Sequence, residues 1–300
     1  MLWMLAAILI CGASVFTACS SNDDNPFQPV VQVGIDKTNF PDDNFWNYLL
    51  EQDYGKDGVL TEAEIRNITV MDVSEKEIKS LKGIEYFTAL RTLNCSDNEL
   101  TELDISGNTA LDTLDCSYNE LTALDVSKNT ALRSLDCGFN ELTALDLSVN
   151  KALTRLSCDD TKLTALDISK NTALTSLSCD DNKLTALDIS KNTALIRLSC
   201  SGNSLTSLDL SKNMALEKLL CFKNQISGQN MDALIGSLRQ NESEEFCAFY
   251  VMDGNEPNQN VCTKSQAAAA KAKGWLPKYW DEDEKAWLEY EGSEPIREKK

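Results

Sequence analysis

Cysteine has the most regular spacing among the residues of this chain that could do chemistry. Seven of the eleven cysteines recur every 21 residues: Cys95, Cys116, Cys137, Cys158, Cys179, Cys200 and Cys221. Thiols can act as nucleophiles or bind metals, but the chain contains no histidine that could activate a thiolate or share a metal site. A straight row of thiols cannot surround a zinc ion, and disulfides between neighbouring copies would strain the repeat. We therefore interpret the seven cysteines as a structural ladder of buried thiols and predict neither a catalytic residue nor an enzymatic activity.

The cysteines mark a repeat of 21 residues that has its own apolar pattern. A leucine stands two residues before each ladder cysteine, and an asparagine stands three residues after it in every copy except one, where Thr161 takes that place. The Leu-x-Cys alternation predicts a short strand that turns both side chains to one face. One copy cannot bury that face alone, so the copies must stack as coils of a solenoid with parallel strands. A first coil without cysteine is expected near residues 71–73, which gives about eight coils over residues 71–226.

The second half of each copy is rich in Thr, Asp, Ser and Asn, which favour turns and local backbone bonding over a helix interior. Extended and turn segments are therefore expected on the convex side of the solenoid. One aspartate per copy falls in this half: Asp104, Asp125, Asp146, Asp167, Asp188 and Asp209. We interpret these aspartates as solvated and turn-forming, with a calcium-binding column as the alternative.

These copies resemble the cysteine-containing leucine-rich repeats of internalin J and of many Bacteroidetes surface lipoproteins. The resemblance covers residues 71 to 226 and implies a curved leucine-rich-repeat solenoid with a parallel sheet on its concave face. It also implies adhesion or host interaction at a bacterial surface. The chain departs from internalin J in carrying a lipobox-like segment and no sorting motif at its C-terminus.

The N-terminal segment predicts export and lipid anchoring. Residues 1–19 contain a short apolar stretch and end in Phe-Thr-Ala-Cys, which resembles the lipobox that leads to lipidation of Cys19. A plain secretory signal cut near Ala18 is the alternative. Residues 20–35 begin with a polar, acidic run and are expected to form a disordered tether. The predicted localisation is an outer membrane lipoprotein exposed at the cell surface.

A cap is expected at each end of the solenoid. Residues 36–70 predict a helical N-terminal cap in which residues 53–64 resemble an EF-hand loop, with Asp53, Asp57 and Glu64 as calcium ligands. Gly55 stands where that loop needs a third oxygen, so binding would be weak, and a helix-turn-helix cap is the alternative. No other cofactor is predicted. Residues 227–292 predict an α/β C-terminal cap, in which Cys247 and Cys262 could pair, and residues 293–300 a disordered tail.

The outward side chains of the concave face are the predicted ligand-binding residues. They comprise Tyr118, Phe139, Asp115, Asp136, Arg155, Arg197, Asp159, Asp160, Asp180 and Asp181. Aromatic residues and arginine are frequent anchors of protein interfaces, so a protein partner at the host or bacterial surface is predicted. The alternative is a glycan, bound by Trp280 and Trp287 in a nutrient-uptake lipoprotein. The formal net charge of -19 argues against nucleic acid and anionic membranes as partners, and leaves the lipid anchor as the only membrane contact.

Overall fold

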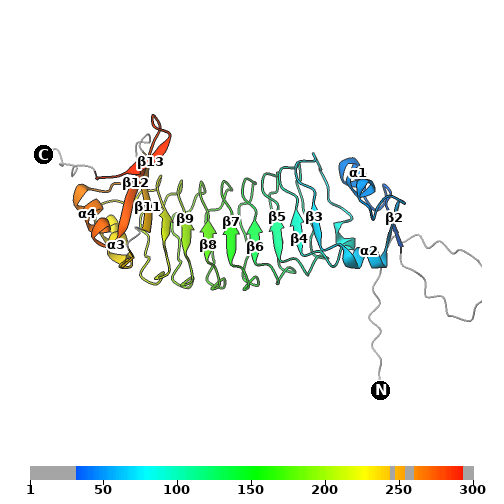
Figure 1. Ribbon diagram of the computed structural model, residues 1–300, viewed down its shortest axis with the longest axis horizontal. Coiled ribbons are helices and arrows are strands. Elements are labelled where there is room, and N and C mark those ends of the chain that lie inside the picture. Colours follow the sequence, from blue (N-terminus) through cyan, green and yellow to red (C-terminus); the bar gives the residue numbers. More distant parts are fainter. Residues whose placement is uncertain (1–31, 244–246, 254–259, 293–300) are drawn as a thin grey trace, which may run out of the picture.

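One sheet of eleven strands runs along the molecule in a computed structural model that describes residues 32–243, 247–253 and 260–292. Its strands lie side by side in chain order from β3 to β13, with a cap at each end (Figure 1). All neighbouring strands are parallel except β12 and β13. The predicted signal segment with Cys19, most of the tether and the tail 293–300 lie outside the described residues.

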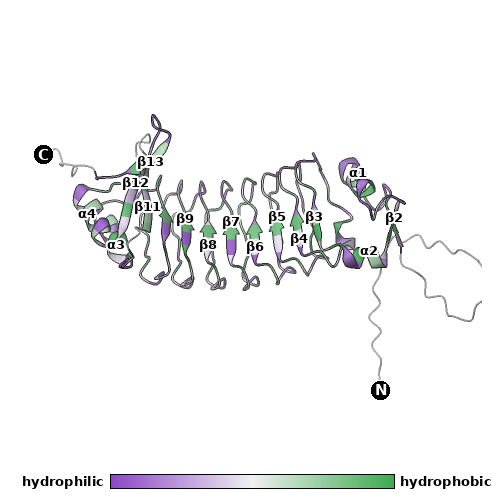
Figure 2. Ribbon diagram, viewed as in Figure 1, coloured by the Kyte–Doolittle hydropathy of each residue, from purple (hydrophilic) through white to green (hydrophobic). Residues whose placement is uncertain are grey.

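The repeat strands confirm the predicted solenoid. They are β3 (Val70–Asp72), β4 (Thr92–Asn94), β5 (Thr113–Asp115), β6 (Ser134–Asp136), β7 (Arg155–Ser157), β8 (Ser176–Ser178), β9 (Arg197–Ser199) and β10 (Lys218–Leu220). Equivalent leucines pair in register, as Leu93 does with Leu114, and the leucines and ladder cysteines are buried. Figure 2 shows the hydrophobic residues recurring from strand to strand. The cysteine-free first coil begins at β3, so these eight strands are separated by seven turns of the solenoid.

The return segments between β4 and β10 contain turns and bends but neither helix nor strand. In the first of them Asn108 N–H donates to Ile105 O at 3.0 Å, and Leu111 N–H donates to Asn108 O at 3.1 Å. The Asp104 carboxylate accepts from Ser106 N–H at 2.9 Å. The same aspartate contact recurs in the five following copies, which confirms that these aspartates form turns.

A buried asparagine ladder joins each coil to the one before it. Asn140 Nδ2 donates to Cys116 O of the preceding coil at 3.0 Å, and Asn140 Oδ1 accepts from Leu121 N–H at 2.9 Å. Thr161 interrupts this ladder, because its hydroxyl contacts Cys158 O and Asn182 Oδ1 but no group of the preceding coil. A second ladder, on the return side, is formed by Asn108, Asn129, Asn150, Asn171, Asn192 and Asn213.

The N-terminal cap consists of β1 (Gln32–Gly34), α1 (Asp43–Glu51), β2 (Val59–Thr61) and α2 (Glu62–Asn67). The prediction of a tether up to residue 35 is wrong for its last residues, because β1 pairs with β2 and buries Val33 and Ile35. One carboxylate oxygen of Asp42 caps α1. Its other oxygen accepts from Lys79 N–H and Ser80 N–H of the first coil, at 2.8 and 3.1 Å, and so fixes the cap to the solenoid. A single 3-10 turn (Ile84–Tyr86) follows in that coil.

The C-terminal cap extends the sheet beyond the last repeat. It contains α3 (Gly228–Ser237), β11 (Cys247–Asp253), α4 (Lys264–Ala272), β12 (Trp275–Asp281) and β13 (Ala286–Glu289). In β11, Phe249 pairs with Leu219 and is buried, so it continues the row of leucines. Thr263 forms the expected capping box at the start of α4. No helix within the described ranges is long and apolar enough to cross a membrane.

Candidate functional site

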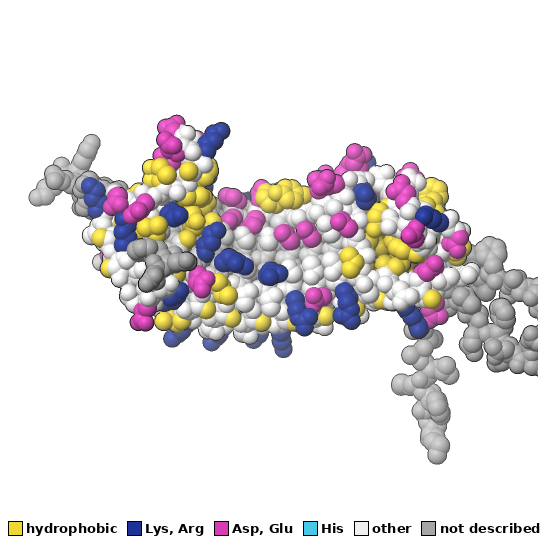
Figure 3. Space-filling view, in the orientation of Figure 1, with side chains coloured by type: hydrophobic (Ala, Val, Ile, Leu, Met, Phe, Trp, Pro, Cys, Tyr) yellow, Lys and Arg dark blue, Asp and Glu magenta, His cyan; other side chains and the backbone are white. Residues whose placement is uncertain are grey.

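The outward face of strands β4 to β10, here called the sheet face, carries side chains in straight rows. The row at the first strand position comprises Thr92, Thr113, Ser134, Arg155, Ser176, Arg197 and Lys218. The row at the third position comprises Asn94, Asp115, Asp136, Ser157, Ser178, Ser199 and Leu220. In Figure 3 basic side chains gather near the strand starts, and acidic side chains and a hydrophobic patch gather near the strand ends. The sheet face therefore separates its charges along the strand direction.

The hydrophobic patch contains the two aromatic residues that the sequence singled out. Tyr118 and Phe139 stack with their ring centroids 4.1 Å apart and their planes 7° from parallel. Tyr118 is 54% exposed and Phe139 is 39% exposed, so the stacked rings form one contiguous apolar patch, the kind of surface that marks interaction sites more often than isolated apolar side chains do. The structure therefore places the two side chains together, at the surface, as predicted.

Both rings belong to a column of residues in the left-handed backbone region. The column comprises Asp97, Tyr118, Phe139, Asp160, Asp181, Gly202 and Lys223, with φ between 44° and 63°. Interstrand bonds continue through it, since Tyr118 N–H donates to Gly138 O at 3.0 Å and Phe139 N–H donates to Asp159 O at 2.7 Å. Bonds to neighbouring coils thus hold the backbone of Tyr118 and Phe139 in a fixed position. The left-handed conformation of this column was not predicted from the sequence, although Asp and Gly at the equivalent positions are typical of left-handed turns.

Three of the predicted acidic residues, Asp136, Asp159 and Asp180, lie beside the column and bond to neighbouring coils. Asp136 Oδ1 accepts from Ser157 Oγ at 3.0 Å, and Asp159 Oδ1 accepts from Asp180 N–H at 2.7 Å. Asp180 accepts from Ser199 Oγ at 2.5 Å and from Ser201 N–H at 2.6 Å. Asp115 accepts from Ser117, its neighbour two residues on. These serine partners were not predicted.

Burial is the largest cause of raised pKa values at three of the predicted acids. It raises the pKa of Asp180 to about 7, against the lowering effect of the Ser199 hydrogen bond. Burial is also the largest cause of the raised pKa values of Asp136 and Asp181. A carboxylate whose charge is poorly solvated gains more from a cation than an exposed one does. This part of the face is thus suited to a positively charged group.

Arg155 and Arg197 lie at the opposite edge of the sheet face. Both are exposed and stand at the first positions of β7 and β9. Within the described ranges neither forms an ion pair with the acidic residues, whereas Arg133 and Lys162 elsewhere on the solenoid pair with Asp112 and Glu141. The two arginines therefore remain available to a partner, but at a distance from the aromatic pair in the strand direction.

The ladder cysteines are structural. All seven are buried free thiols, and Cys137 Sγ lies 3.5 Å from Ser157 O of the next coil. Burial is the largest cause of the raised pKa values of all seven. Outside the ladder, Cys247 forms no disulfide with Cys262 and instead accepts a hydrogen bond from the Arg239 guanidinium at 3.2 Å.

The EF-hand-like loop does not bring its three candidate ligands together. Asp53 pairs with Lys56, and Asp57 accepts from Val59 N–H at 3.1 Å. Glu64 closes the capping box of α2 by accepting from Thr61 N–H at 2.8 Å. Among the described residues no group of three or more acidic or thiol side chains could hold a metal ion. The loop geometry is that of a turn between β2 and the preceding helix, and calcium binding here stays a prediction.

The C-terminal aromatic residues pack against one another. Trp287 lies 5.0 Å from Phe222, 4.7 Å from Tyr250 and 5.5 Å from Trp280, measured between ring centroids, and all three pairs are tilted or edge-to-face. Trp280 and Trp287 are only partly exposed. The ring planes are steeply inclined to one another and do not form one flat platform, which argues against the predicted glycan site at Trp280 and Trp287.

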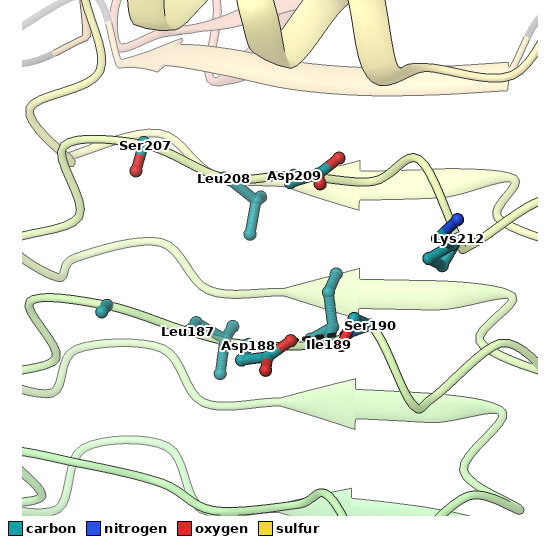
Figure 4. Close-up of a pocket in the computed structure, with 9 residues that line it drawn as sticks. Leu187, Asp188, Ile189, Ser190, Ser207, Leu208, Asp209 and Lys212 are labelled. Carbon is teal, nitrogen blue, oxygen red and sulfur yellow. Dashed lines mark hydrogen bonds between the residues drawn. The ribbon is translucent and has the colours of Figure 1, made fainter.

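A shallow pocket of about 240 Å³ lies on the return side, between two successive coils. Figure 4 shows Leu187 and Leu208 on its lining, with Asp188, Asp209 and Lys212 near them. The Asp188 carboxylate is held by Ser190 N–H at 2.9 Å, as in the other turns. The lining therefore offers repeat side chains and no pair of residues suited to catalysis.

Comparisons with known proteins identify the fold. The functional domain of internalin J (InlJ) from Listeria monocytogenes, which includes a cysteine ladder, is 34% identical over 80% of this chain with a TM-score of 0.66, and the chain spans 55% of that structure. Internalin C2 of the same organism is 22% identical over 68% of this chain and 93% of its own, with a TM-score of 0.61. A leucine-rich-repeat protein of Leptospira interrogans is 21% identical over 72% of this chain and 67% of its own, with a TM-score of 0.54. No protein-family model and no curated protein matches the sequence.

Proposed function

We propose, from the premise that this chain is a leucine-rich-repeat solenoid with a cysteine ladder, that it is a non-catalytic module that binds a protein through its sheet face. The observation that carries the proposal is the exposed Tyr118–Phe139 stack, held by the backbone bonds of two coils. Exposed aromatic side chains on a rigid backbone lose little conformational entropy on binding and are frequent interface anchors. The similarity to internalin J supports a role in protein interaction.

Replacing both aromatic residues tests this proposal. Tyr118→Ala combined with Phe139→Ala should weaken binding to a purified partner at least about 100-fold, because truncation of central aromatic anchors costs about 2–4 kcal/mol. The measurement is surface plasmon resonance with the full chain and a partner first identified by cross-linking to host and bacterial surface proteins.

The matched control is Val149→Ala combined with Met214→Ala, which removes exposed apolar side chains from the return segments. These are 41% and 62% exposed, comparable with the two rings. Binding should be unchanged in the control. Equal affinity of the aromatic double variant and the unmodified chain would rule out the Tyr118–Phe139 stack as the anchor.

We further propose that the module is displayed at the outer membrane through a lipid on Cys19. The support is the lipobox-like sequence before that residue and the polar stretch after it. Cells fed an alkyne fatty acid should label the full chain, and Cys19→Ala should lose the label while Cys11→Ala keeps it. Labelling that persists in Cys19→Ala would contradict the anchor.

A further inference from the structure

The aromatic stack is bracketed by carboxylates along the solenoid. Asp97 precedes Tyr118 in the left-handed column, and Asp160 follows Phe139. Adjacent strands lie about 4.8 Å apart, so each of these carboxylates is one coil from a ring. Asp97 N–H donates to Ser117 O and Asp160 N–H donates to Asp180 O, at 3.0 and 2.9 Å, so the backbone fixes all four positions. The column therefore presents two rings between two acids on one rigid line.

A second line of acids runs beside the first. Asp115 and Asp136 occupy the third positions of β5 and β6, three residues before Tyr118 and Phe139 respectively. Both are half-buried, and within the described residues neither they nor Asp97 and Asp160 form an ion pair. A group that lands on the stacked rings thus meets carboxylates on several sides and no paired cation.

The opposite charge is placed away from the stack. Arg155, Arg197 and Lys218 occupy the row where the strands start, and the rings lie beyond the strand ends. Lys218 is already directed at another ring, with its Nζ 5.4 Å from the Tyr250 ring centroid. An acidic partner segment would be repelled at the aromatic end of the face, whereas a basic one would be attracted there.

Arginine is the side chain that fits both features of this end of the face. Its planar guanidinium stacks on aromatic rings, and its forked donors pair with a carboxylate through two hydrogen bonds. Lysine can pair with a carboxylate only as a point charge. The rest of such a partner would lie along the column, which continues past Asp160 to Asp181.

We propose that the rim formed by Asp97, Tyr118, Phe139, Asp136 and Asp160 binds an extended, arginine-bearing segment of the protein partner. In this arrangement a guanidinium stacks on the exposed rings and donates to Asp136 or Asp160. The inference rests on the proposed function and gives the chemical class of the partner at the same site.

The test uses a fluorescein-labelled peptide in which arginine alternates with serine. A peptide of about nine residues extends about 30 Å and covers about six coils, which is longer than the acidic–aromatic column. Fluorescence anisotropy with the full chain should show the arginine peptide binding at least about tenfold more tightly than the matching glutamate peptide, with the lysine peptide between them. Raising NaCl from about 50 to about 300 mM should weaken the binding, because exposed charges are screened.

Two charge-matched double variants locate the contact. Asp136→Asn with Asp160→Asn should lower the affinity for the arginine peptide about tenfold or more, since it removes both carboxylates next to the rings. Asp146→Asn with Asp188→Asn removes the same charge from the return turns and should leave the affinity within about twofold. Equal binding of the arginine and glutamate peptides, or an equal loss in the two variants, would overturn the inference.

The peptide experiment also separates this inference from the proposed function. The preference for arginine over glutamate is measured on the unmodified chain, so it does not depend on how a variant folds. A natural partner whose binding needs Tyr118 and Phe139, in a chain that shows no preference for arginine, would leave the proposed function in place and remove only the arginine-bearing segment.

Discussion

The seven ladder thiols should stay unmodified when the native chain meets a thiol reagent at pH 8, and all seven should react once the chain is unfolded. Two physical causes combine. Each thiol is fully buried, and burial raises its pKa so far that almost no thiolate forms. Reaction then requires unfolding, so the native rate should be at least about 1,000-fold slower for a domain of ordinary stability. Peptide mass mapping of the full chain after timed labelling measures each cysteine separately.

Ser157→Cys provides the matched control for this experiment. Ser157 is half-buried on the outer side of β7, and its neighbour Cys158 points inward on the same chain segment. The introduced thiol should react within minutes, while Cys158 of the same variant stays protected. Rapid native labelling of any ladder cysteine would show that the sulfurs do not line the core, and the stacked-coil interpretation would fail with it.

The repeat region could be predicted from sequence because one local pattern determines it. Leu-x-Cys fixes an inward pair in each strand, and the strict 21-residue spacing forces equivalent residues to pair in register, as Leu135 does with Leu156. The stacking of Tyr118 on Phe139 follows from the same spacing, because the two residues occupy the same position in successive coils. Wherever the copies keep the 21-residue spacing, the position of a residue in one coil predicts the positions of the equivalent residues in the neighbouring coils.

The ends of the solenoid could not be predicted this way, because non-local contacts replace the repeat. Asn260 lies 39 residues after Cys221, far out of phase. Its Nδ2 nevertheless donates to Cys221 O at 2.7 Å and its Oδ1 accepts from Ile226 N–H at 2.9 Å, so it acts as the next member of the asparagine ladder. β1 in the predicted tether is similar, since only its partner β2 shows that Val33 is buried.

The side-chain hydrogen bonds of the candidate site also could not be predicted from the sequence. Asp180 sits in the same row as Ser117 and Ser201, and its bonds to Ser199 and Ser201 depend on which rotamer two coils leave room for. The row predicts that Asp180 faces outward near other acids. It does not predict that burial and these serines hold the carboxylate close to the neighbouring coil, and hence it does not predict the raised pKa.

Asn140→Ala should lower the free energy of unfolding by about 3–5 kcal/mol, because it removes several buried hydrogen bonds and leaves backbone groups unpaired. The lost contacts are those of Asn140 Nδ2 to Cys116 O, Cys137 O and Gly138 O, and that of Leu121 N–H to Asn140 Oδ1. Urea unfolding followed by circular dichroism measures the change. Asn203→Ala is the matched control, since Asn203 makes the equivalent four bonds.

The two substitutions should differ in the shape of the transition, and Thr161 is the reason. The coil of Cys137 already lacks an asparagine on its far side, because Thr161 bonds only to its own coil and to Asn182. Asn140→Ala removes the asparagine bonds to the Cys116 coil as well, so it leaves both junctions of the Cys137 coil without an asparagine. A repeat array with one weakly joined coil unfolds in two parts. The transition of Asn140→Ala should broaden, while that of Asn203→Ala stays sharp.

Thr161→Asn should raise the free energy of unfolding of the unmodified chain by about 1 kcal/mol, because the new asparagine can bond to the Cys137 coil. Combined with Asn140→Ala, it should sharpen the transition of that variant for the same reason. Two identical, sharp transitions for the two alanine variants would mean that the asparagine ladder does not set the coupling between coils.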